Sequence, residues 1–119
     1  MKYPKSIITS DMKHCYLCGK GDHIEIHHIF SGSNRQHSTA FGCVVPLCHE
    51  CHQGTNGVHS NREKMDYLRK VAQSCCEHEY HWTEQDFRSV FHRNYLTDED
   101  RESLKGKVMQ TIDLGEEII

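Results

Sequence analysis

The sequence predicts a small α+β domain with a zinc-stabilised core followed by C-terminal helices. The chain has 119 residues, enough for one domain. Hydrophobic residues make up only 36% of it, so the core is expected to be thin. Seven cysteines and eleven histidines supply metal ligands, and an odd number of cysteines fits a disulfide framework poorly. We therefore expect metal, and not disulfides, to reinforce the core.

Charge divides the chain into a body, residues 1–96, and an acidic, helical or partly disordered tail, residues 97–119. The body has eleven bases and ten acids, whereas the tail has seven acids and three bases. The net charge of −3 thus comes from the tail and neither supports nor excludes a polyphosphate substrate. No apolar run approaches the ~18 residues that span a bilayer, and the N-terminus lacks a signal-peptide stretch. We expect an intracellular protein with reduced thiols and no membrane partner.

The first half predicts two strands around a polar loop. Residues 1–14 are expected to be irregular. Residues 24–29 alternate apolar and polar side chains, which places Glu25, His27 and Ile29 on one face and His28 on the other. Residues 31–39 lack periodicity and predict a loop, and residues 42–47 predict a second strand ended by Pro46.

The second half predicts helices. Glycine-rich residues 53–59 break regular structure, after which Ser60 and Glu63 form a capping box for a helix reaching about Ser74. Thr83 caps a second helix that ends near Asn94, and a third piece covers roughly residues 98–110.

Two Cys-x-x-Cys pairs, Cys15/Cys18 and Cys48/Cys51, predict a structural zinc site with four thiolates. Three other interpretations remain open. A histidine, His49 or His52, replaces one cysteine; the cysteines are small buried hydrophobic residues; or Cys75 and Cys76, with His78 and His81, form a second site. A thiol-disulfide oxidoreductase is disfavoured because its βαβ pattern is missing.

Four histidines flank the cysteine pairs. His27 and His28 are adjacent at a strand end and project to opposite sides, so one can ligate a divalent cation while the other stays free as a base. His52 directly follows a cysteine of the zinc site and is held rigidly, which suits a ligand. His59 follows a glycine-rich turn and can fold back to the same metal, although a plain surface histidine is also an open interpretation.

Residues 14–60 resemble the HNH endonucleases, also called ββα-metal or His-Me finger nucleases, in the short zinc-stapled form of phages and prophages. The resemblance is carried by four strings: Cys15-x-x-Cys18-Gly19, Ile26-His27-His28-Ile29, Pro46-Leu47-Cys48-x-x-Cys51-His52 and Gly57-Val58-His59. It implies a ββα-metal, treble-clef-like core and a bacterial host cytoplasm.

The resemblance also implies the role of each residue. His28 is the general base, while His27, His52 and His59 hold a catalytic Mg²⁺, Mn²⁺, Ni²⁺ or Zn²⁺. Cys15, Cys18, Cys48 and Cys51 hold the structural Zn²⁺. The expected reaction is hydrolysis or nicking of DNA with little sequence specificity, leaving a 3′-hydroxyl and a 5′-phosphate. Because His28 must be neutral, activity is expected to fall below about pH 6.

One position departs from the family pattern. Members usually carry an asparagine about five residues before the second Cys-x-x-Cys, where this chain has Cys43. The asparagine braces the loop by hydrogen bonds, so either activity is affected or Asn34 or His37 braces the loop instead.

Substrate contacts are expected from Arg35, Arg62, Lys64 and Arg69, although a solvated helix face explains Lys64 equally well. DNA is the expected partner, and a homodimer or phage packaging or recombination machinery is compatible with the short chain. The main alternative function is a non-catalytic zinc module that contacts DNA or a protein. Two bound metals per chain would favour the nuclease, and a single zinc would favour the module.

Overall fold

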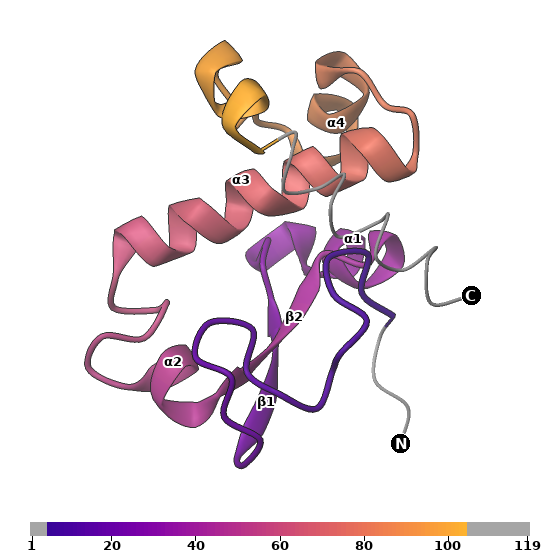
Figure 1. The fold of residues 1–119 in the computed structure, drawn as a ribbon. Coiled ribbons are helices and arrows are strands. Elements are labelled where there is room, and N and C mark those ends of the chain that lie inside the picture. The colour runs from indigo at the N-terminus through magenta and orange to yellow at the C-terminus, as the bar shows by residue number, and fades with distance from the viewer. Residues whose placement is uncertain (1–4, 105–119) are drawn as a thin grey trace.

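The computed structural model describes residues 5–104 as a two-stranded sheet surrounded by helices (Figure 1). Its elements are β1 (Ile24–His28), η1 (Gly32–Asn34), α1 (Arg35–Phe41), β2 (Val44–Cys48), α2 (His49–Gln53), α3 (Arg62–Glu79) and α4 (Glu84–Phe91). Residues 98–104 are also helical. The predicted small α+β class is confirmed. The C-terminal part of the predicted tail, and of its helix over residues 98–110, lies outside the described residues.

The two strands pair antiparallel, from Ile24 opposite Cys48 to His28 opposite Val44. This confirms both predicted strands, although the second begins about two residues later than predicted and runs through Pro46 to Cys48 instead of ending at the proline. β2 is buried along its whole length, whereas β1 is fully buried only at His27. The sheet therefore holds one histidine in the interior and leaves its neighbour, His28, half-buried.

The polar loop predicted over residues 31–39 is wrong, because η1 and α1 occupy most of it. α1 lacks a long apolar stripe; Phe41 anchors it, with its ring packed edge-on against Trp82 and Tyr80. Gly42 then ends the helix in the left-handed region at φ 76°. A Cβ on Gly42 would also lie 2.8 Å from the Lys5 carbonyl oxygen, so this turn needs glycine.

α2 is a short helix that the sequence did not predict. It begins directly after Cys48 and carries Cys51 and His52 on consecutive residues. The glycine-rich segment behind it folds tightly: a Cβ on Gly57 would lie 2.8 Å from the Glu50 carbonyl oxygen. This close return lets Val58 donate to the Cys51 carbonyl and brings His59 back over α2.

The predicted capping box at Ser60 and Glu63 is wrong by one residue. Asn61 is the N-cap of α3, and its side chain accepts from the Lys64 amide. The helix continues five residues beyond Ser74 because Cys75 and Cys76 extend its buried face. The Thr83 cap is confirmed for α4, where it forms a capping box with Asp86.

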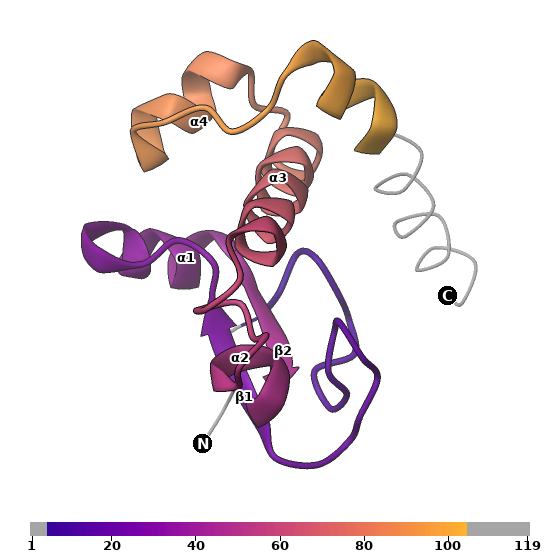
Figure 2. The ribbon, with the colours of Figure 1, turned by 90° about the vertical axis from the view of Figure 1, so that its left-hand side faces the viewer.

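α3 crosses the sheet and separates it from the C-terminal helices (Figures 1 and 2). Leu68 and Val71 of α3 are buried in the same core cluster as Phe30, Phe87 and Phe91. Figure 2 shows α4 and residues 98–104 on the side of α3 away from the sheet. No helix among the described residues is long and apolar enough to cross a membrane.

Candidate metal centres

The four cysteines of the two Cys-x-x-Cys pairs converge. One sulfur from each residue lies within 4.8 Å of the others, and the Cys18 and Cys48 sulfurs are 3.6 Å apart. The first pair is shaped by a tight turn, in which the Gly19 amide donates to the Cys15 carbonyl at 2.9 Å. The second pair comes from the end of β2 and from α2. This group, the four-cysteine cluster, has the composition and geometry to hold a metal such as zinc.

The electrostatics of the four-cysteine cluster favour a cation. Burial acts to raise the pKa of Cys15, but backbone amides, first that of Cys48, outweigh it and lower this pKa to about 6. The pKa of Cys51 is strongly raised, first by burial and then by the neighbouring thiols. The thiolate form of Cys15 is thus stabilised, while the thiolate form of Cys51 is disfavoured. A divalent cation bound among the four sulfurs would stabilise both thiolates.

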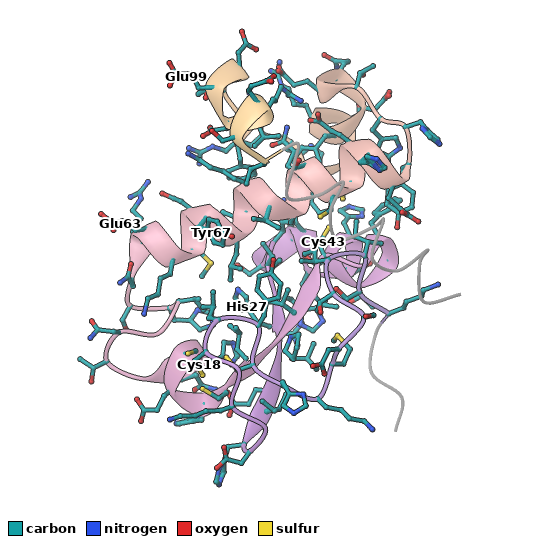
Figure 3. The ribbon with its side chains drawn as sticks, viewed as in Figure 1. Cys18, His27, Cys43, Glu63, Tyr67 and Glu99 are labelled. Atoms are coloured by element: carbon teal, nitrogen blue, oxygen red, sulfur yellow. The ribbon has the colours of Figure 1, made fainter. Side chains whose placement is uncertain are left out.

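Three histidines form a second cluster, the histidine cluster. His27 on β1, His52 on α2 and His59 beyond the glycine turn offer ring nitrogens within 4.8 Å of one another. The Nε2 atoms of His52 and His59 are 3.0 Å apart, and the ring of His27 lies 5.1 Å from that of His52. Figure 3 shows His27 toward α3 and Cys18 farther away, beside α2.

The buried Nε2 atom of His27 has no hydrogen-bond partner among the described residues. His27 is 2% exposed, and an unpaired buried polar atom is expensive. Burial, followed by the charges of His52, His59, His28 and Arg69, lowers the pKa of His27 to about 3. Burial and His52 also lower the pKa of His59. His27 therefore brings a neutral imidazole to the cluster, as a metal ligand must.

Glu25 orients the histidine cluster, a role that the sequence reasoning missed. Its carboxylate accepts from Nδ1 of His52 at 2.7 Å, from Nδ1 of His49 at 2.9 Å and from the Gln53 amide at 3.0 Å. These bonds, first that from His49, lower the pKa of Glu25 to about 2. With Nδ1 of His52 bonded to Glu25, its Nε2 is left to face His59 and His27. Alternation had placed Glu25 on the face of His27, which was the one signal available.

His28 stays outside both clusters. Its side chain is half-buried, and burial followed by the charges of Arg35 and His52 lowers its pKa. The predicted base therefore lies within electrostatic reach of one cluster member, His52, and of the exposed Arg35 at the start of α1. Such a half-buried neutral imidazole is suited to accepting a proton near neutral pH.

Two side chains brace the segment after β1: Ser38 from within it, and Asn34, one of the two predicted residues, through a bond to the end of α4. The buried Ser38 hydroxyl accepts from the Phe30 amide at 3.0 Å and donates to the Phe30 carbonyl at 2.7 Å. The Cys43 amide donates to the Ser38 carbonyl. Asn34 donates to the Phe91 carbonyl.

Two of the three remaining cysteines form a close pair, and none of the three belongs to a metal cluster among the described residues. The sulfurs of Cys43 and Cys76 are 3.3 Å apart and fully buried, joining the start of β2 to α3. Burial raises the pKa of Cys75 to about 12, so this thiol keeps its proton. Across residues 5–104, the four-cysteine and histidine clusters are the two groups with three or more possible ligands.

The predicted substrate-binding residues are separated by the fold. Arg62 and Arg69 lie on α3 and both pair with Asp66, at 3.7 and 3.5 Å. Lys64 donates to the Asn56 carbonyl at 2.6 Å and so ties α3 to the glycine-rich segment. Arg35 stands apart on α1, near His28.

No protein-family model, no curated protein and no solved structure matches this chain.

Proposed function

We propose that the protein is a metal-dependent DNA endonuclease or nickase of the HNH type. The observation that carries the proposal is the convergence of His27, His52 and His59, of which His27 is buried with its Nε2 atom unpaired, next to His28, which lies outside the cluster. A purely structural zinc module has no use for a second ligand cluster beside the four-cysteine cluster. The finer fold belongs to the same proposal: β1, β2 and α2 with two cysteine turns are consistent with a treble-clef-like ββα-metal core.

In the proposed reaction, His28 takes a proton from a water molecule that attacks the phosphodiester phosphorus. His27, His52 and His59 would hold a divalent cation, which would supply positive charge near the negative charge that develops on the phosphate. As the water oxygen bonds to phosphorus, the bond from phosphorus to the 3′-oxygen breaks, and the 3′-oxygen takes a proton from solvent. Arg35, whose charge reaches His28, is placed to attract the phosphate. Glu25 keeps the imidazole of His52 in one tautomer throughout.

The ligand chemistry narrows the choice of catalytic cation. Three imidazole nitrogens suit Zn²⁺ or Ni²⁺ better than Mg²⁺, which prefers oxygen ligands and keeps its water. We therefore propose that cleavage is supported best by Ni²⁺ or Zn²⁺, less by Mn²⁺ and least by Mg²⁺. The four-cysteine cluster holds a separate structural Zn²⁺ in this proposal.

The test is nicking of supercoiled plasmid by zinc-loaded protein supplied with each cation. His28→Ala is expected to lower the rate by about 10²–10⁴-fold, the usual contribution of a general base. His92→Asn is the control, because His92 is exposed at the end of α4, belongs to neither cluster, and has a φ of 69° that asparagine tolerates. Equal cleavage by the wild type and His28→Ala would refute the assignment of the base.

A further inference from the structure

A cation-rich cavity lies between α3 and the segment that follows α4. Its volume is about 180 Å³, far more than the roughly 10–15 Å³ that admits one water molecule. Four basic side chains line it, Arg62, Arg69, Lys70 and Arg93, together with Tyr95 and one carboxylate, Asp66. Such a concentration of positive charge stands out in a chain whose net charge is −3.

A buried polar residue builds this cavity. Gln73 on α3 is fully buried and donates to the Asn94 side chain at 2.7 Å, while its carbonyl oxygen accepts from the Tyr95 amide at 2.7 Å. Asn94 in turn bonds both the amide and the carbonyl of Leu96. These bonds fix the backbone of the segment after α4 against α3. The Tyr95 ring itself packs 5.4 Å from the ring of buried Phe30, so it is held in place before any ligand arrives.

Two guanidinium groups flank the fixed ring. Arg93 lies 5.3 Å and Arg69 lies 5.8 Å from the centre of the Tyr95 ring. Arg62 and Arg69 share Asp66, and Lys70 pairs with Asp100 at 3.2 Å, so those cations are partly neutralised. Arg93 has no carboxylate within ion-pair distance among the described residues, and its side chain is exposed. The cavity therefore keeps an excess of positive charge and one uncommitted guanidinium.

The cavity also lies near the histidine cluster. Arg62, which lines it, lies three residues after His59, and Lys64 on the same turn of α3 donates to the Asn56 carbonyl of the glycine-rich segment that leads to His59. A strand whose reacting phosphate sits at the histidines thus has a second cationic site beside it on α3.

We propose that this cavity binds a backbone phosphate of a nucleic-acid strand, one that flanks the phosphate at the histidine cluster, with Arg93 and Arg69 as the donors. The inference rests on the proposed function and adds to it a positioning site formed by the segment after α4. A guanidinium is planar through its own bonding, and an aromatic ring beside it limits its rotation. Its N–H groups therefore stay oriented to bind phosphate oxygens in pairs. The contact is to the backbone, so it fixes register without reading sequence.

The test is binding of a 20-base-pair DNA duplex to the zinc-loaded His28→Ala protein, measured by fluorescence anisotropy between 50 and 200 mM salt. The variants are Arg93→Ala, Arg93→Lys and, as a matched control, Arg88→Ala, since Arg88 is an exposed α4 arginine outside the cavity. Loss of one phosphate contact lowers the slope of log affinity against log salt by about 0.9, so the affinity ratio between the two salt concentrations shrinks about 3.5-fold. Arg93→Ala should show this change, whereas Arg93→Lys and Arg88→Ala should keep the wild-type slope.

A slope for Arg93→Ala equal to that of Arg88→Ala would overturn the proposal. A second arm titrates inorganic pyrophosphate while the arginine side-chain NMR signals are followed. If pyrophosphate shifts the Arg93 signal but duplex binding ignores Arg93, the cavity serves a free phosphate compound and the nucleic-acid proposal is overturned. Failure of the nuclease proposal is distinct: the wild type would then cleave no plasmid with any cation, while the Arg93→Ala effect on binding persists.

Discussion

Replacement of Glu25 by glutamine should weaken metal binding at the histidine cluster without altering any ligand. The carboxylate accepts three hydrogen bonds, two on Oε1 from His52 and Gln53 and one on Oε2 from His49. Glutamine keeps the size and one acceptor oxygen but loses the charge and turns an amide donor toward one of these groups. His52 is then free to adopt the wrong tautomer or to rotate away from His59.

The size of the effect follows from which bond matters. The side chain of His52 is 14% exposed and that of His49 is 58% exposed, so the bond to His52 is the better shielded. Loss of such an outer carboxylate typically weakens metal affinity 10–100-fold. This corresponds to about 1.4–2.7 kcal/mol, within the range for a hydrogen bond to a charged group.

The assay is calorimetric titration of zinc-loaded protein with Ni²⁺ at pH 7, comparing the wild type with Glu25→Gln and Glu25→Ala. Glu50→Gln is the control, because it also removes one negative charge, here from α2, and Glu50 is not the carboxylate that bonds His52. If Glu25→Gln binds Ni²⁺ with an affinity within twofold of that of Glu50→Gln, Glu25 does not orient a metal ligand.

Three further predictions concern pH, metal removal and the braced loop. Burial and the charge of Arg35 lower the pKa of His28, so its neutral form persists below pH 6.5. kcat/KM for nicking should therefore fall only as the pH drops through that lowered pKa, and a decline that begins above pH 6.5 would contradict this. Removal of zinc from the four-cysteine cluster by a chelator should unfold the chain, because a structural zinc contributes about 10–16 kcal/mol and total stability is about 5–15 kcal/mol. Far-UV circular dichroism measures the unfolding, and an unchanged spectrum would exclude a structural role. Ser38→Ala should lower the free energy of unfolding by about 1–3 kcal/mol in urea, because the Phe30 amide loses its buried acceptor, whereas the exposed Ser89→Ala should change it little.

Features whose signal lies in local spacing could be predicted from the sequence. The two Cys-x-x-Cys pairs and the alternation around His27 are local patterns, and the structure brings those cysteines together and pairs those strands. Thr83 with Asp86 is likewise a local pattern, and it caps α4 as predicted.

Features that depend on distant partners could not be predicted. Glu25 gains its role from His49 and His52, which lie 24 and 27 positions further along the chain and reach it only once the strand register is set. α1 has a polar sequence and is held by Phe41 against Tyr80 and Trp82. It therefore lacks the apolar residues at helical spacing that would have predicted a helix. The cavity beside Tyr95 lies between α3 and the segment after α4, which Gln73 of α3 joins by accepting from the Tyr95 amide.

In our proposal the chain holds two distinct metals, one structural and one at the histidines. Anomalous diffraction from crystals of the zinc-loaded protein soaked in Ni²⁺ tests it most directly, because the Zn and Ni absorption edges identify each ion. We predict a zinc peak among Cys15, Cys18, Cys48 and Cys51, and a separate nickel peak bonded to His27, His52 and His59. A zinc peak alone, with no ion at the histidines in saturating Ni²⁺, would contradict the account.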